Sequence, residues 1–183
     1  MIVIINGSLG VGKTSVADAI HQRFAKSIHL DGDAIGDEHP FEIYDDARID
    51  RLYRALTLLV DFYQKEGYSD FIINYVFESA QSLEDLLTLL RPLDEHIHCY
   101  WLTCSREEQT KRIRGRNRQE LDWELQRFVD LQNIQAEAAR QGFIGQQVDT
   151  SALSTEGVAD LIWQDLLRLH PAEVVVPDDL DLS

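Results

Sequence analysis

The segment from residue 7 to residue 14 constrains this chain more than any other feature. It reads Gly-Ser-Leu-Gly-Val-Gly-Lys-Thr, follows a short apolar run at 2–5, and precedes helical spacing of apolar residues over 13–24. A Gly-x-x-x-x-Gly-Lys-Thr pattern between a buried strand and an amphipathic helix predicts a phosphate-binding P-loop. The alternative is a glycine-rich turn that merely links the two elements, and the flanking elements favour the P-loop.

Each residue type in this loop has a physical role. Glycines permit positive φ and let backbone N–H groups approach phosphate oxygens, and the following helix directs the positive end of its dipole at them. Lys13 would contact the β- and γ-phosphates, and Thr14 would ligate Mg²⁺. We therefore expect Mg·ATP as the ligand, held by nine residues: Gly7, Ser8, Leu9, Gly10, Val11, Gly12, Lys13, Thr14 and Ser15.

Composition and charge narrow the class of protein. The chain has 183 residues, 44% of them hydrophobic and 27% charged, as in an ordinary globular domain. No apolar run approaches the roughly 18 residues of a membrane span, and the N-terminal run is too short for a signal peptide. We expect a cytoplasmic protein. Its formal net charge of −15 disfavours nucleic acid and anionic membrane as partners, and its oligomeric state stays open.

Neither the cysteines nor the histidines favour a zinc or redox site. Cys99 and Cys104 match no zinc or redox spacing, and we expect a buried structural thiol at Cys99. His96 and His98 could share one face of a strand, but they have no acidic or thiol companion at ligand spacing.

Strand-like and helical segments alternate along the chain. The strand-like segments are 2–5, 27–30, 71–77, 98–102 and 146–148; the helical ones are about 13–24, 45–64, 83–90, a segment opened by a Ser105–Glu108 capping box, 120–141 and 155–169. This alternation predicts a three-layer α/β/α P-loop NTPase fold with a five-stranded parallel sheet. We expect one domain over 1–170, with a small helical lid at about 110–125, and an acidic C-terminal tail over 171–183.

An acidic turn, Asp31-Gly32-Asp33, follows the second predicted strand. Carboxyl ends of parallel strands share one edge of a sheet, so this turn would lie near the P-loop. Asp33 could then orient a substrate hydroxyl and accept its proton, and either carboxylate could help to hold Mg²⁺. An ordinary Asp-Gly turn is the alternative, which the neighbouring P-loop disfavours.

Five basic residues fall between 111 and 118. Arg112 and Arg116 are one helical turn apart and would share a face. Arginines on a closing lid would neutralise the transferring phosphoryl group and exclude water. The alternative is a solvated basic helix that pairs with its neighbouring glutamates.

The P-loop, the acidic turn, the basic segment and Val148-Asp149-Thr150-Ser151 together resemble the small-molecule kinases of the P-loop nucleoside monophosphate kinase fold. The resemblance spans about Met1 to Leu169. Shikimate, gluconate and adenylylsulfate kinases, chloramphenicol phosphotransferase and uncharacterised AAA-type ATP-binding relatives belong to that group. The opening Ile5-Asn6-Gly7 is also similar to tunicamycin-resistance proteins of this fold.

The resemblance implies roles by position. Asp33 would be the acid or base that binds the acceptor, and Arg112 and Arg116 would be lid arginines that act with Lys13 on the transferring group. Backbone near the adenine would come from three residues: Asp149, Thr150 and Ser151.

Two features depart from the pattern of that family. Asn74 stands in the third strand where a Walker B aspartate would be sought, and an amide brings no charge to Mg²⁺; Asp31 or Asp33 could compensate. The dipeptide His39-Pro40 after the acidic turn is similar to one in gluconate kinase. The spacing between the turn and the dipeptide is longer here, so the resemblance does not imply specificity for sugar acids. Candidates for binding the acceptor, besides the acidic turn, are His39, Phe41, Arg48, Tyr75 and Phe77, each of which also fits a loop or core position.

Three functions follow from these observations. The leading hypothesis is transfer of the γ-phosphoryl group of ATP to a hydroxyl of a small molecule. A nucleotide-dependent binding or sequestering protein is the alternative, because of Asn74, and a polynucleotide 5′-end kinase is disfavoured by the net charge of −15. The acceptor itself is not predicted.

Overall fold

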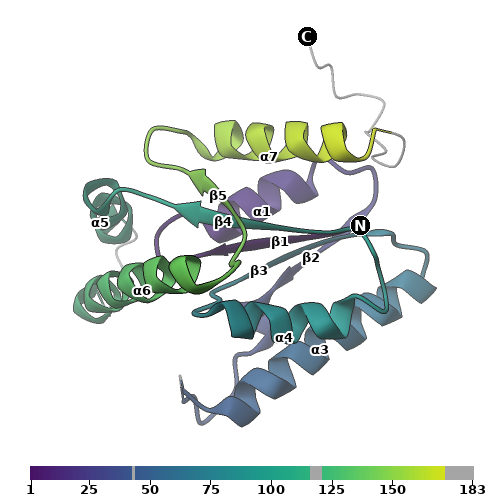
Figure 1. Cartoon of the computed structure of the whole chain (residues 1–183), viewed down its shortest axis with the longest axis horizontal. Coiled ribbons are helices and arrows are strands. Elements are labelled where there is room, and N and C mark those ends of the chain that lie inside the picture. The colour runs from purple at the N-terminus through teal and green to yellow at the C-terminus, as the bar shows by residue number, and fades with distance from the viewer. Residues whose placement is uncertain (43, 116–120, 172–183) are drawn as a thin grey trace.

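The computed structural model describes residues 1–42, 44–115 and 121–171 (Figure 1). Its strands are β1 (Ile2–Gly7), β2 (Ser27–Asp31), β3 (Asp70–Tyr75), β4 (Ile97–Thr103) and β5 (Gln146–Asp149). Its helices are α1 (Lys13–His21), α2 (Gly32–Ile35), α3 (Asp46–Lys65), α4 (Ala80–Leu90), α5 (Arg106–Gly115), α6 (Leu121–Gln141) and α7 (Thr155–Leu169). The strands pair in parallel in the order β2-β3-β1-β4-β5, which confirms the predicted α/β/α P-loop fold.

Alternate side chains of the central strand separate the core into two halves. Val3 and Ile5 pack with α1 and α7 on one face of the sheet, and Ile2 and Ile4 pack with α3 and α4 on the other. Figure 1 shows these helix pairs above and below the sheet. Because all four residues are fully buried, the sheet is covered on both faces, as its continuous apolar strands require.

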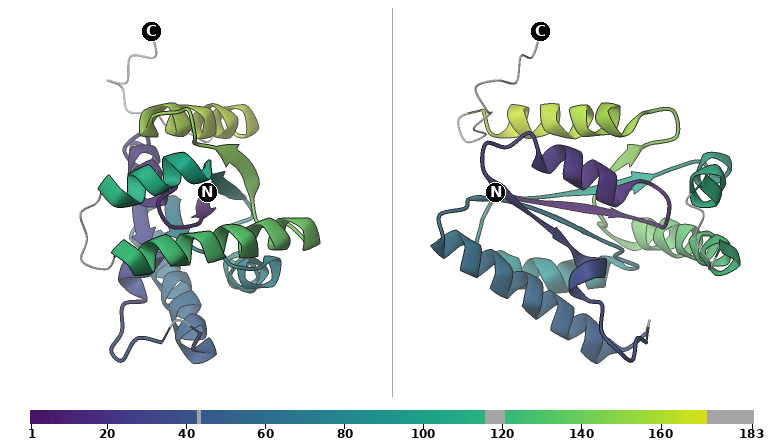
Figure 2. Two further views of the ribbon diagram at one scale, coloured as in Figure 1. Left: turned by 90° about the vertical axis from the view of Figure 1, so that its left-hand side faces the viewer. Right: turned by 180° about the vertical axis from the view of Figure 1, so that it is seen from behind.

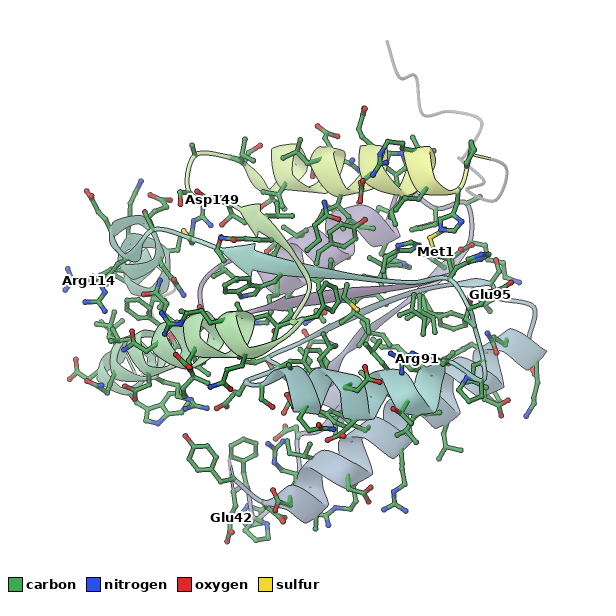
Figure 3. All side chains as sticks on the ribbon, viewed as in Figure 1. Met1, Glu42, Arg91, Glu95, Arg114 and Asp149 are labelled. Atoms are coloured by element: carbon green, nitrogen blue, oxygen red, sulfur yellow. The ribbon has the colours of Figure 1, made fainter. Side chains whose placement is uncertain are left out.

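The carboxyl ends of the strands form one edge of the sheet, from which the site is built. Helices α5 and α6 lie side by side beyond this edge, as both views in Figure 2 show. In Figure 3, Asp149 and Arg114 lie toward this edge, and Met1 and Glu95 lie at the opposite one. The P-loop, the end of β2 and the end of β3 therefore converge beside α5 and α6.

Local structure differs from the sequence-based expectations at several element ends; α1, for example, ends at His21 rather than near residue 24. The predicted acidic turn is the end of β2 followed by the one-turn helix α2, whose N-cap is Asp31. Strand β3 ends at Tyr75, because the Phe77 N–H donates to the Asn6 side chain at 2.9 Å instead of continuing the strand.

The predicted capping box before α5 is only half formed. The Glu108 N–H donates to Ser105 Oγ at 3.3 Å, but the Ser105 N–H donates to Ser151 Oγ at 2.7 Å. The Glu108 carboxylate therefore remains available for Arg112, to which it is paired at 3.1 Å. A complete capping box lies at α4, between Ser79 and Ser82.

Some predicted regions lie outside the described residues. These are Arg116 and the adjoining part of the lid, and the tail from 172 onward. Among the helices that the structure describes, none combines the length and apolar character needed to cross a bilayer.

Candidate active site

The P-loop lies between β1 and α1 as predicted, and its glycines are required by its backbone. Gly10 and Gly12 have φ angles of 79° and 99°, in a region that other residues rarely adopt. A Cβ on Gly10 would also lie 2.7 Å from Ile113 Cγ1 of α5. Helix α5 thus packs directly against the loop, and glycine leaves the room for it.

Positive charge and N–H groups converge on this loop. Lys13 is buried, and its Nζ donates to the Ser8 carbonyl at 3.2 Å. Helix α1 begins here with Gly12 as its N-cap; no described side chain caps it, and its first turn holds no acidic residue. Its first N–H groups and the positive end of its dipole therefore suit a phosphate group.

Thr14, Asp31 and Asn74 meet beside the loop. Thr14 Oγ1 donates to Asp31 Oδ2 at 3.2 Å and accepts from Asn74 Nδ2 at 3.4 Å. Asn74 is fully buried, and its Oδ1 lies 2.5 Å from His29 Nε2, which fixes the orientation of the amide. Asp31 and Asn74 are partners on adjacent strands, so Asp31 brings a carboxylate to the position where the third strand has only an amide.

The environment of Asp31 keeps it ionised. Burial alone would raise its pKa, but hydrogen bonds from Asn74, from the backbone of Ala34 and Asp33, and from Thr14 outweigh burial and lower the pKa. In the described part of the chain, no three His, Cys, Asp or Glu side chains group as a metal site. A cation bound by Asp31 and Thr14 would therefore take its other ligands from phosphate oxygens and water.

A cavity of about 680 Å³ opens beside the P-loop, and we call it the Asp33 cavity. Leu9 of the P-loop and Asp33 both line it. The Asp33 N–H donates to Asp31 Oδ1 at 2.9 Å, so the residue beside Thr14 also fixes the backbone of the residue in the cavity. The volume lies within the range of small-molecule sites.

The structure places some of the predicted acceptor residues in this cavity and others elsewhere. Phe41, Arg48 and Tyr75 line it. Phe77 instead lies fully buried in the core with α3 and α4, because its apolar ring packs there. His39 is exposed in the loop before α3 and does not line the cavity.

The cavity also contains residues that the sequence analysis did not identify. They include Asp37, Tyr44, Asp46, Tyr53, Glu78, Trp123 and Arg127. Trp123 and Arg127 are one turn apart on α6, a spacing that could have marked a shared helix face. Nothing local, however, indicates that this face meets the loop before α3.

Arg112 does not line the Asp33 cavity. Its guanidinium donates to Val11 O at 3.3 Å, to Thr150 Oγ1 at 3.0 Å and to Thr150 O at 2.8 Å. It lines a second cavity, of about 380 Å³, with Gly10, Gly12, Ser15 and Thr150. Arg112 therefore joins the P-loop to the segment after β5, at the predicted adenine side. The predicted solvated alternative is also partly present, since Arg112 pairs with Glu108.

A buried amide, Gln109, holds the P-loop from α5. Its Nε2 donates to Ser8 Oγ at 2.7 Å and to the Leu9 carbonyl. Gln132 of α6 donates to Gln109 Oε1 at 2.7 Å. The conformation of the loop is therefore tied to both α5 and α6.

A second buried amide group joins α6 to the ends of β1 and β3. Gln135 Nε2 donates to Asn6 Oδ1 and to the Phe77 carbonyl, each at 3.0 Å. Asn6 Oδ1 also accepts from the Gly7 N–H at 2.7 Å. Asn6 and Gln135 thus fix the point at which the chain enters the P-loop.

Comparisons with solved structures agree with this architecture. The tunicamycin resistance protein of Deinococcus radiodurans is 21% identical (TM-score 0.63, covering 90% of this chain and 94% of that one). Shikimate kinase from Bacteroides thetaiotaomicron is 15% identical (0.60, 93% and 98%). A gluconokinase from Sinorhizobium meliloti 1021 is 15% identical (0.59, 91% and 91%). At these identities the likeness establishes the fold alone, a parallel sheet covered by helices on both faces.

The sequence comparisons identify the family. No curated protein matches the sequence of this chain. The profile of the AAA domain family matches residues 2–143, from β1 through the P-loop to just beyond the end of α6. This protein is therefore a member of the AAA domain family.

Proposed function

We propose that the protein transfers the γ-phosphoryl group of Mg·ATP to a hydroxyl of a small molecule bound in the Asp33 cavity. The observation that carries this proposal is that Leu9 of the P-loop and Asp33 line the same cavity. A nucleotide on the loop and a hydroxyl at Asp33 would thus share one space. The kinases named above, which have the same fold, add support.

Different residues around the loop would bind different parts of the nucleotide. The first N–H groups of α1 and the Lys13 ammonium would hold the β- and γ-phosphates. The second cavity, with Arg112 and Thr150, would take the adenosine, next to Asp149 and Ser151. Thr14 and Asp31 would hold Mg²⁺, which neutralises charge on the phosphate oxygens when bound. Arg116, outside the described residues, keeps its proposed role in the lid.

Asp33 is the proposed general base. Its carboxylate would accept the proton of the acceptor hydroxyl as the oxygen forms a bond to the γ-phosphorus. The bond between the γ-phosphorus and the β–γ bridging oxygen breaks, and ADP leaves. Because Asp31 holds the backbone of Asp33 and also contacts Thr14, the base and the proposed metal ligand are fixed relative to each other.

A panel of hydroxylated small molecules tests the proposal, with an oligonucleotide 5′-hydroxyl as one member. ADP release and ³¹P NMR of the product would measure transfer. We expect Asp33→Asn to lower kcat by roughly 10²–10⁴-fold, the usual contribution of a general base, and to leave ATP affinity unchanged.

The matched control is Asp18→Asn, an exposed carboxylate on α1 that accepts from Gln22. It should retain full activity. Unchanged phosphoryl transfer by the Asp33→Asn variant would show that Asp33 is not the general base. ATP binding with no phosphorylated product from any member of the panel would overturn the proposed transfer.

A further inference from the structure

Aromatic side chains give the Asp33 cavity an apolar lining on several sides. Phe41, Tyr44, Tyr53, Tyr75 and Trp123 all line it. Phe41, Tyr44 and Trp123 are also 55%, 75% and 49% exposed. Single exposed aromatic residues need no explanation, but three at one cavity mark a surface that another molecule covers. Such rings stack on flat apolar groups.

The charged groups of the same cavity are mostly acidic. Four carboxylates line it, against two guanidinium groups: Asp33, Asp37, Asp46 and Glu78 against Arg48 and Arg127. A cavity lined by one predominant sign attracts ligands of the opposite sign and repels those of its own.

The Arg127 guanidinium already has partners within the protein. Its guanidinium is paired with the Glu78 carboxylate, donates to the Tyr44 hydroxyl at 2.9 Å and lies over the Tyr44 ring. A carboxylate on a ligand would compete with Glu78 for the Arg127 guanidinium, whose charge Glu78 already neutralises, and the two carboxylates would repel each other. Glu78 therefore acts against acidic ligands.

Arg48 is used to orient aromatic rings. It is buried, its Nε donates to the Glu42 carbonyl at 3.1 Å, and its guanidinium lies 4.7 Å from the centre of the Phe41 ring. Burial raises the pKa of Tyr75, while a hydrogen bond with Arg48 opposes that effect and the charge of Asp33 adds to it. Arg48 thus connects Phe41 and Tyr75 on the wall that also contains Asp33.

We infer that the Asp33 cavity selects an uncharged or cationic molecule with a flat, unsaturated ring near its hydroxyl, and that Glu78 excludes acidic acceptors by neutralising Arg127. That the ligand carries a hydroxyl rests on the proposed function. Its flat ring and its lack of negative charge are inferred from the residues that line the cavity alone.

A matched ligand series tests the selection without requiring turnover. The probes are 4-(aminomethyl)benzyl alcohol, 4-methylbenzyl alcohol, 4-carboxybenzyl alcohol and the saturated analogue 4-methylcyclohexylmethanol. Calorimetry, with a non-hydrolysable ATP analogue and Mg²⁺ present, measures their affinities for the full chain. We expect the first two to bind at least about tenfold more tightly than the carboxylate, one charged contact being worth about that much. The saturated analogue should bind more weakly than its aromatic partner.

The Glu78→Gln variant tests whether Glu78 excludes acidic acceptors from the cavity. Removing this carboxylate frees the Arg127 guanidinium, so affinity for 4-carboxybenzyl alcohol should rise by at least about tenfold. The control is Glu137→Gln. It breaks a similar glutamate–arginine pair, with Arg140, at an exposed position on α6, the helix that also carries Arg127. It should leave all four affinities unchanged.

The outcomes separate this inference from the proposed function. Preference for the carboxylate in the wild type, no binding by any probe at millimolar concentration, or no gain in Glu78→Gln would overturn it. Binding in the expected order with no phosphorylated product would support the inference and count against phosphoryl transfer instead.

Discussion

Thr14 Oγ1 donates to Asp31 Oδ2 at 3.2 Å, and this contact brings together the end of β2 and the start of α1. Because the pKa of Asp31 is lowered, its carboxylate is charged at neutral pH. We expect Asp31→Asn to weaken the Mg²⁺ dependence of ATP binding. Calorimetry should show a loss of about tenfold or more in affinity for Mg·ATP, and little change for ATP in EDTA, since only the metal contact is removed.

Asp33→Asn is the comparison for that experiment. Asp33 lines the cavity, whereas Asp31 faces Thr14, so the Asp33 variant should keep the Mg²⁺ dependence of the wild type. Equal losses in the two variants would mean that Mg²⁺ is not held by Asp31 in particular.

Asn74→Asp would place a second carboxylate at a fully buried position beside Asp31. Two neighbouring carboxylates repel each other, so we expect a loss of about 1–3 kcal/mol in the free energy of unfolding without Mg²⁺. A divalent cation would relieve this repulsion. Thermal unfolding should therefore show a larger rise in Tm on adding Mg·ATP than in the wild type. Asn133→Asp, at an exposed position on α6, should show no such difference; an equal rise in all three proteins would contradict the prediction.

Gln109→Glu keeps the size of the side chain but removes the amide donor that holds the P-loop. The variant loses the bonds to Ser8 Oγ and to the Leu9 carbonyl. An unmade buried hydrogen bond costs roughly 1–3 kcal/mol. We expect a corresponding loss of stability, about tenfold weaker ATP binding, and faster amide hydrogen exchange over residues 8–12. Gln81→Glu, at an exposed position on α4, is the control, and equal exchange rates in both variants would argue against a role for Gln109 in fixing the loop.

Cys99 predicts how stability falls at alkaline pH. Burial raises the pKa of its thiol to about 12, whereas an unfolded cysteine titrates near 8.5. Above pH ~8.5 the unfolded chain therefore binds fewer protons than the native chain, and the free energy of unfolding falls as pH rises. The contribution is about 1.4 kcal/mol per pH unit, or about 2 kcal/mol by pH 10. Urea unfolding at pH 8, 9 and 10 should show a shallower decline for Cys99→Ala; parallel declines would contradict this prediction.

The parts of the fold set by local sequence were predictable. The predicted helix at 155–169 matches α7, because Ser154 caps it and its apolar residues recur at helical spacing. The P-loop was also predictable, since positive φ at Gly10 and Gly12 depends on glycine itself. The buried thiol at Cys99 is likewise confirmed.

The walls of the cavity were not predictable in the same way. Arg127 and Glu78 are paired across 49 positions of sequence, and Gln109 reaches Ser8 across 101. No propensity or periodicity encodes such a contact, because it depends on how α5 and α6 pack beyond the sheet. The role of Arg112 was only partly anticipated for the same reason: its spacing places it on a helix, but the fold decides that it contacts Thr150.

Helix α6 contributes both to the Asp33 cavity and to the contacts that hold the P-loop. Trp123 and Arg127 line the Asp33 cavity, and further along the helix Gln132 donates to Gln109, the amide that holds the P-loop. A rigid helix transmits a displacement at one end to the other. If occupancy of the cavity shifts α6, then it changes the affinity of the loop for nucleotide. Thermodynamic linkage requires the effect to be reciprocal: nucleotide must then change the affinity for the acceptor by the same factor.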